Sequence, residues 1–522
     1  MAESIACYPT GVLFLYLLLA PPTHADEWDL VRVDIADFPG ALASSTVGST
    51  LLAPPTDGTT WRIESIPELD QATNDIPLDQ VWDSTLSTAI GLDAWHDAGH
   101  LGQGVRVAVF DLQWFGAEIR SSEIGNPITH DCWADPLCEQ PMDTLRPRFD
   151  FERGSHGVAC AELVHDIAPE AELHLVRVNG QTTFENAVDW AIREEIDLIS
   201  MSMTFFNESF YDGTGVISKE ISRLEEAGIL MVTSAGNNGE RHYEDTFRDQ
   251  NKNGYHEFQS GSEFLPIRAQ GGDGRVAAVI WDEFEACGTN DLAVELYDAK
   301  GNTIRRADSF QDAENKKCMP VERIRGPLEL EGDWAYLRIF RPSGSGPLPL
   351  DIMSFSGSIY GAMAGNSMAD PAPHPYAFTV GAVPVDGYMH NDVEFFSSQG
   401  PSRGSTFKPS IAAPDGVSTR TYGANRFYGT SASAPITTGA LAVRMSADES
   451  ISPRQAAIDL QNWAWTGQDP WTRPDPGLGA GRLRLPKPEM LTPKRCTSTP
   501  LQATLLLLPL FAIRRKQISL HP

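Results

Sequence analysis

Apolar strands and amphipathic helices are predicted to alternate repeatedly between Val105 and Gly236. Continuous apolar strands that alternate with helices are typical of an α/β domain with a mostly parallel central sheet. Sheets of this kind place functional groups at the carboxyl ends of their strands. Strands are predicted over 105–110, 172–178, 196–203 and 229–236, and helices over 156–167, 184–195 and 217–228.

The alternation stops after Gly239. Residues 241–358 contain runs such as VAAVIW, LAVELYD and WAYLRIF, which are separated by Gly, Asn and Asp turns. This pattern is typical of antiparallel β structure. We therefore predict an antiparallel, sandwich-like β domain over 241–358, inserted into a discontinuous α/β domain over 83–240 and 359–486.

The α/β pattern returns after the insertion. The helix that follows Ser431 begins with GTSASAP, and we expect Pro435 to lie in its first turn, where no backbone N–H is needed. The other predicted elements are a strand over 377–383, a helix over 452–464 and a final turn and strand over 476–485.

Both ends of the chain have the composition of processing segments. Residues 11–20, GVLFLYLLLA, form an apolar run of the length found in signal peptides, which predicts a signal peptide over 1–25 and export. Residues 26–82 are predicted to be a pro-segment or arm. Residues 487–522 combine Cys496, a short apolar run and a basic cluster, which resembles bacterial C-terminal sorting tails and suggests association with the cell envelope.

The charge and cysteine content narrow the function classes. The 522 residues carry a formal net charge of −30, which argues against nucleic acid as a partner. Two local disulfides, Cys132–Cys138 and Cys287–Cys318, would fit an oxidising compartment, although connectivity cannot be deduced from sequence. Cys160 is then left as a buried thiol.

Four residues at strand ends or helix starts have the chemistry that a serine nucleophile requires. Ser431 is the candidate nucleophile, His156 the base and Asp111 the orienting carboxylate, and the Asn237 amide is a candidate oxyanion donor. Taken singly, each has an ordinary structural alternative: a strand-end Asp, a helix-start His, a turn Asn and a helix N-cap.

Together these residues resemble the motifs of one family, the subtilisin-like serine proteases (subtilases, peptidase S8). VAVFD is similar to the aspartate motif of that family, HGVACAELVHDIAPEAEL to its histidine motif, SAGNNG to its asparagine motif and GTSASAP to its serine motif. LISMSM, FTVGAV, FFSSQGP, KPSIAAPDG and LGAGRL give further similarity. The resemblance covers about residues 83–240 and 359–486 and implies a subtilisin-like three-layer fold.

The resemblance also implies roles. Ser431 would attack the scissile carbonyl, His156 would transfer the proton and Asp111 would orient His156. Asn237 and the Ser431 N–H would stabilise the oxyanion. Substrate would bind as an extended strand beside Ser202, and the specificity pocket would be lined by 202–204 and 234–236, including Gly236. No cofactor is required for this chemistry.

Some positions depart from the family pattern. Leu112 and Gln113 follow the aspartate where a Ser or Thr and then Gly is usual, and HGVACAE replaces the usual HGTHVAG. Thr204 stands where glycine is common, and Trp114 and Phe115 are expected to crowd the site. These changes bear on substrate preference more than on chemistry.

Two other motifs suggest different chemistry. GPSRG (400–404) fits the nucleophile-elbow pattern of esterases around Ser402, but Pro409 and Pro414 disfavour the helix that this motif needs. DQNKNGYHE (249–257) is spaced like a calcium loop but lacks the glutamate at its twelfth position, so an Asn/Asp-rich turn is the simpler interpretation.

The leading hypothesis is an exported serine endopeptidase that acts on protein or peptide substrates. The alternative is a catalytically silent binding or adhesion protein on a subtilisin-like scaffold. This alternative is based on the altered surroundings of Asp111 and on the large β insertion. A third interpretation, an esterase, depends only on GPSRG.

Overall fold

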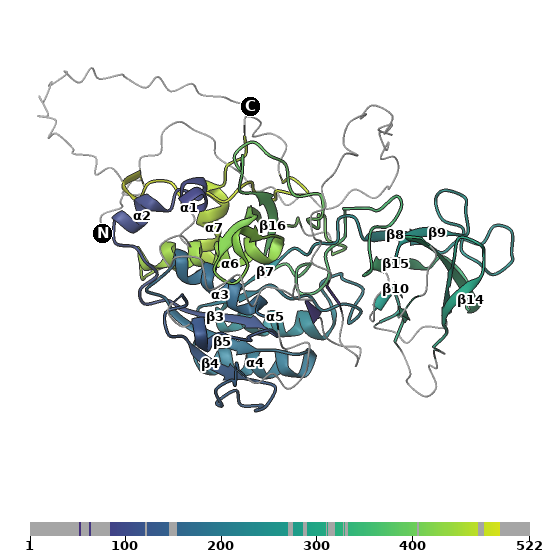
Figure 1. Cartoon of the computed structure of the whole chain (residues 1–522), viewed down its shortest axis with the longest axis horizontal. Coiled ribbons are helices and arrows are strands. Elements are labelled where there is room, and N and C mark those ends of the chain that lie inside the picture. Colours follow the sequence, from purple (N-terminus) through teal and green to yellow (C-terminus); the bar gives the residue numbers. More distant parts are fainter. Residues whose placement is uncertain are drawn as a thin grey trace, which may run out of the picture. The chain divides into compact units, whose positions relative to one another are not determined.

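The structure is a computed structural model that describes most of the chain between residues 84 and 490 (Figure 1). No helix within these described residues is long and apolar enough to cross a membrane. The described residues are 52–53, 62–63, 84–120, 123–145, 154–269, 275–284, 290–309, 311, 319–326, 328, 332–404, 407–467 and 474–490.

Most of the two predicted end segments therefore lie outside the described residues. This holds for the signal peptide over 1–25, for the pro-segment over 26–82 apart from the paired strands β1 (Leu52–Ala53) and β2 (Arg62–Ile63), and for the tail beyond residue 490.

A seven-stranded sheet forms the centre of the α/β part, in the order β17-β16-β7-β6-β3-β5-β4. Every neighbouring pair in it is parallel, as the alternation of strands and helices predicts. The chain order reverses at β3, which lies between β5 and β6, and ligands bind at such reversal points in open α/β sheets. The strands are β3 (Arg106–Asp111), β4 (Ile128–Asp131), β5 (Glu172–Arg177), β6 (Leu198–Met201), β7 (Leu230–Ser234), β16 (Phe378–Pro384) and β17 (Ile411–Asp415).

The central strands are buried on both faces, so helices cover the sheet from two sides. Helices α3 and α6 pack on each other and on the sheet, while α4 and α5 pack as a second pair (Figure 1). The predicted fold class, a three-layer α/β architecture, is thereby confirmed. The helices are α1 (Ser84–Ile90), α2 (Asp93–Asp97), α3 (His156–Ile167), α4 (Gln181–Arg193), α5 (Gly215–Ala227), α6 (Thr430–Ser446) and α7 (Pro453–Trp463).

Local signals explain where several helices begin and end. Ser452 caps α7 by accepting a hydrogen bond from the Gln455 N–H, and Pro453 occupies the first helical position. Gly228 ends α5 in the left-handed region with φ of 79°. The strand predicted over 476–485 is wrong, because these residues form a turn with isolated bridges to residues such as Ile411 and Ala412.

Two antiparallel four-stranded sheets interrupt the α/β part between β7 and β16. Their orders are β13-β10-β15-β8 and β12-β11-β14-β9, and side chains of both share one buried core, as in a sandwich. The domain boundaries predicted at residues 241 and 358 stay predictions. The strands are β8 (His242–Thr246), β9 (Leu265–Arg268), β10 (Arg275–Trp281), β11 (Asp291–Tyr297), β12 (Thr303–Ala307), β13 (Val321–Arg325), β14 (Trp334–Ser343) and β15 (Pro349–Ser354).

Candidate active site

Asp111 and His156 form a buried hydrogen-bonded pair. Nδ1 of His156 lies 2.7 Å from Oδ2 of Asp111, and the two side chains are 3% and 1% exposed. The other carboxylate oxygen, Oδ1, accepts hydrogen bonds from the backbone N–H groups of Leu112 (2.8 Å) and Gln113 (2.9 Å). Because both carboxylate oxygens are occupied, Asp111 is held in one orientation, and Nε2 of His156 is left for other chemistry.

The backbone brings these two residues together at a strand end and a helix start. Asp111 is the last residue of β3, and His156 is the first residue of α3. Gly157 allows this approach, since a Cβ there would lie 2.7 Å from Cβ of Asp111. The Gly157 N–H also donates to the Gln113 carbonyl, so the first turn of α3 is fixed to the loop after β3.

The environment of His156 favours its protonated form. Burial by itself lowers the pKa of His156, whereas negative charge at Cys160 and at Asp111 raises it, and the net direction is upward. Burial also raises the pKa of the Cys160 thiol. A thiol with a raised pKa is neutral near pH 7, so the Asp111 carboxylate supplies the attraction. Cys160 is buried and free, as predicted.

Ser431 is the second residue of α6 and is only half-buried. Its carbonyl accepts hydrogen bonds from the Ser202 hydroxyl (3.0 Å) and the Cys160 thiol (3.6 Å). Among the described residues, no hydrogen bond joins the Ser431 hydroxyl to His156. Hydrogen bonds of this kind are often long or absent without substrate.

The expectation that Pro435 lies in the first turn of this helix is wrong, because it lies inside α6. A helical N–H bonds to the carbonyl four residues earlier, so proline at 435 leaves the Ser431 carbonyl without its usual partner. Ser202 and Cys160 take that place. The Ser431 carbonyl therefore links the start of α6 to α3 and to the residue that follows β6.

Asn237 lies directly beside this helix start. Its Oδ1 accepts hydrogen bonds from the Thr430 N–H (3.1 Å) and hydroxyl (3.0 Å). Because a backbone N–H can only donate, the amide oxygen faces Thr430, and the Asn237 Nδ2 group is left to donate elsewhere. Thr430 belongs to the GTSASAP motif, but nothing in the sequence pattern predicts that it bonds to Asn237.

Close packing between α3 and α6 holds the two halves of the site in register. Gly439 of α6 makes this possible, because a Cβ there would lie 2.7 Å from Cβ of Ile167 on α3. A glycine inside a helix costs about 1 kcal/mol in stability relative to alanine. The close packing of α3 against α6 offsets this cost.

A pocket opens beside Ser431 and brings most of the predicted site residues together. Thr204 lines it, as expected from its position after β6. The expected crowding by Trp114 is wrong, because Trp114 is fully buried and donates to the Asp111 carbonyl. All lining residues are uncharged: Leu112, Gln113, Ser202, Met203, Thr204, Phe206, Ser234, Gly236, Asn237, Asn238, Thr430 and Ser431.

Metal chemistry has little support at this site. Asp111, His156 and Cys160 are the group of candidate ligands found among the described residues, with ligand atoms within 4.8 Å of one another. Hydrogen bonding between Asp111 and His156 already uses one ligand atom of each. In the loop 249–257, Asp249 and Asn251 accept hydrogen bonds from backbone N–H groups, as in a turn, and calcium there stays an untested alternative.

Other predictions from the sequence have mixed outcomes. Cys132 and Cys138 form a disulfide, whereas Cys287 and Cys318 lie outside the described residues. No helix follows Ser402 in the described part of 403–410, so the geometry of a nucleophile elbow is missing.

Comparisons with known proteins agree on one family. The sequence model of peptidase S8, described as the subtilase family, matches residues 151–301 and 349–476. A thermostable alkaline protease of Halalkalibacterium halodurans is 27% identical over 165 residues, which cover 28% of this chain and 38% of that protein. The chain thus spans well under half the length of this curated relative.

A solved structure supports the fold. The structure of the Clostridium perfringens CspB protease is similar with a TM-score of 0.56 and 15% identity, covering 78% of this chain and 99% of that chain. At such low identity the likeness is one of fold.

Proposed function

This chain belongs to the subtilase family, and we propose that it is a serine endopeptidase acting through Ser431, His156 and Asp111. The observation that carries the proposal is the buried hydrogen bond between His156 and Asp111, because it leaves Nε2 of His156 available as a base. The family match and the position of Ser431 at the start of α6 support the same assignment.

The proposed reaction is acyl transfer to water. Nε2 of His156 removes the proton from the Ser431 hydroxyl as the oxygen attacks the scissile carbonyl carbon, and then donates that proton to the leaving amine. Water attacks the resulting acyl-enzyme with His156 again as the base, which releases the acid product and restores Ser431. Asp111 keeps the imidazole in the required tautomer and stabilises its charge.

Two donors are proposed to stabilise the oxyanion. Nδ2 of Asn237 is directed away from Thr430, and the Ser431 N–H lies at a helix start, where it has no partner within the helix. Donors that are fixed before the reaction stabilise the developing charge without reorganisation.

The pocket supports an uncharged substrate side chain on the acyl side of the scissile bond. Its lining carries no charge, and Thr204 and Phe206 add bulk to it. An ion buried there would lose hydration without gaining a partner. Peptide is proposed to bind as an extended strand beside Ser202.

We also propose that the protein is exported. The apolar run at 11–20 and the Cys132–Cys138 disulfide support this location. Association with the envelope through the C-terminal tail rests on the sequence pattern alone. The high negative charge argues against nucleic acid as a partner.

Hydrolysis of a protein substrate tests the activity. Purified full chain should cleave casein or a quenched peptide, and Ser431→Ala should lower kcat on the order of 10⁶-fold, the magnitude for the corresponding serine of subtilisin, a member of this family. Equal activity of the two proteins would rule out Ser431 as the nucleophile. A folded but inactive wild-type chain would favour the binding-protein alternative.

A further inference from the structure

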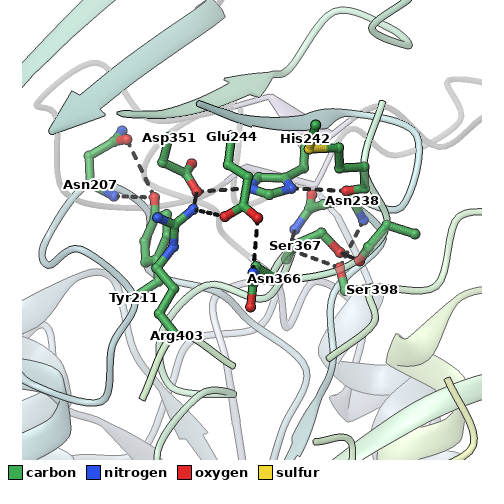
Figure 2. Close-up of polar contacts among 12 residues, drawn as sticks. Asn207, Tyr211, Asn238, His242, Glu244, Asp351, Asn366, Ser367, Ser398 and Arg403 are labelled. Atoms are coloured by element: carbon green, nitrogen blue, oxygen red, sulfur yellow. Dashed lines mark hydrogen bonds and ion pairs between the residues drawn. The ribbon is translucent and has the colours of Figure 1, made fainter. Parts of the chain in front are cut away.

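The chain enters the inserted β sheets directly after the loop that carries Asn237. That loop follows β7, and β8 begins at His242. Four charged side chains lie where these sheets meet the α/β part: His242 and Glu244 on β8, Asp351 on β15, and Arg403 from the segment before β17 (Figure 2). We refer to these four residues as the charge cluster.

Arg403 is the centre of the charge cluster. Its guanidinium group lies 2.5 Å from the Asp351 carboxylate and 3.1 Å from that of Glu244. It also lies 4.4 Å from the ring centre of Phe210, in cation–π geometry. The Arg403 side chain is 12% exposed, so these contacts are largely screened from water.

His242 completes the charge cluster as a cation. Its Nε2 lies 2.8 Å from the Asp351 carboxylate, and its Nδ1 lies 2.9 Å from the Met363 carbonyl. Both neighbours can only accept hydrogen bonds, so both ring nitrogens must carry protons. The charge cluster thus pairs two cations with two anions, which is the condition under which buried charges are tolerated.

A side-chain amide continues the contacts toward the active site. Nδ2 of Asn366 donates a 3.0 Å hydrogen bond to Glu244. The next residue, Ser367, is fully buried, and its carbonyl accepts hydrogen bonds from Nδ2 of Asn238 and from the Ser398 hydroxyl, each at 3.1 Å (Figure 2).

Further hydrogen bonds hold Gly236 and Asn238, the two sequence neighbours of Asn237. The Asn238 N–H donates to the Ser398 hydroxyl (3.1 Å), and the Ser398 N–H donates to the Gly236 carbonyl (2.8 Å). Gly236 has φ of 102°, and a Cβ there would lie 3.0 Å from Ser398 Oγ. The backbone on either side of Asn237 is therefore bonded to Ser398, which is in turn bonded to Ser367. Ser367 follows Asn366 in the chain, and Asn366 donates to Glu244 of the charge cluster.

We propose that the charge cluster is a positioning device for Asn237, through which the inserted β sheets hold the oxyanion donor in its reactive place. The inference rests on the proposed peptidase function. Arg403 acts here as a positioning residue, since it bonds the inserted sheets to the α/β part and contacts neither substrate nor Ser431.

The expected effect is on the chemical step. Displacing a catalytic donor by a fraction of an ångström to 1 Å can cost up to about 100-fold in rate. Arg403→Met should therefore lower kcat by at least about tenfold and leave KM within about twofold. A uniform loss of substrate binding would instead raise KM.

A double-mutant cycle tests whether this effect passes through Asn237. Four full-length proteins are compared by peptide hydrolysis: wild type, Arg403→Met, Asn237→Ala and the double variant. If Arg403 acts by placing Asn237, its substitution should change kcat less than about twofold in the Asn237→Ala background, because coupled residues are not additive.

Two further variants serve as a control for destabilisation of the inserted sheets and as a substitute for Arg403→Met. Arg338→Met removes a half-buried arginine on β14 that pairs with Glu263, and it should leave kcat unchanged although it weakens the inserted sheets. Asn366→Gly removes the link to Glu244 while tolerating the positive φ of 56° at that position, and it replaces Arg403→Met if that protein does not fold.

Each outcome decides the question. Unchanged kcat in Arg403→Met, an equal fold-loss in both backgrounds, or an equal fold-loss in Arg338→Met overturns the positioning role while the peptidase function stands. An inactive wild-type chain overturns the peptidase function and this inference together.

Discussion

Nδ1 of His156 donates a 2.7 Å hydrogen bond to Oδ2 of Asp111, in a setting where both side chains are almost completely shielded from solvent. The bond links the end of β3 to the start of α3. It fixes the tautomer of His156 and leaves Nε2 available for the proposed proton exchange with Ser431. The proposed chemistry depends on this relationship more than on any other contact.

The first prediction concerns pH. His156 must be neutral to accept a proton, and Asp111 raises its pKa above the usual 6.5 despite the opposing effect of burial. We expect kcat/KM to increase with pH, with a midpoint above 6.5. Initial rates on an uncharged peptide between pH 5 and pH 10 measure the midpoint, and a value below 6.5 would contradict this electrostatic account.

The second prediction concerns the oxyanion donor. Asn237→Ala should lower kcat by about 100- to 1,000-fold, with little change in KM. Asn237→Asp is the matched variant, because it keeps an acceptor for Thr430 and replaces the donor with a negatively charged oxygen. Steady-state kinetics should show a loss in Asn237→Asp at least as large as in Asn237→Ala, and full activity in Asn237→Asp would remove the amide from the mechanism.

The sequence predicts the parts of the site whose signals are local. Each candidate site residue lies in a short motif at a strand end or helix start: Asp111, His156, Asn237 and Ser431. Their roles could therefore be predicted from the order and local context of these motifs. The parallel sheet was predictable for the same reason, because strand and helix periodicities are local properties.

Contacts between distant segments were not predictable. The sequence predicts Pro435 in the first turn of its helix, but the structure places it inside α6. Ser202 and Cys160 replace the hydrogen bond that the proline cannot donate, and they reach the Ser431 carbonyl only through three-dimensional packing. Likewise, His242 and Arg403 lie far apart in sequence and meet at Asp351 only because two parts of the chain pack together.

The third prediction concerns stability near the site. Glu162 stands on α3, is 1% exposed and accepts hydrogen bonds from the Thr421 hydroxyl and N–H. Burial raises the pKa of Glu162 from 4.5 to about 7, with the Thr421 hydrogen bonds opposing. Between these two values the folded state binds more protons than the unfolded state, so stability decreases as pH rises.

Glu162→Gln measures this contribution, because glutamine mimics the neutral acid. Unfolding by urea at pH 5 and pH 8, in a Ser431→Ala background that prevents self-cleavage, compares the two proteins. We expect the stability of the glutamine variant relative to its parent to improve by on the order of 3 kcal/mol between these pH values. An equal difference in unfolding free energy between the two proteins at both pH values would show that folding does not shift the pKa of Glu162.

Covalent labelling is the most direct test of whether Ser431 is the nucleophile. A fluorophosphonate probe is incubated with the folded full chain, and the modified residue is located by peptide mapping with mass spectrometry. We predict one adduct on Ser431 in the wild type and none in Ser431→Ala. A wild-type protein without an adduct, or with its adduct on Ser402, would contradict the assignment of Ser431.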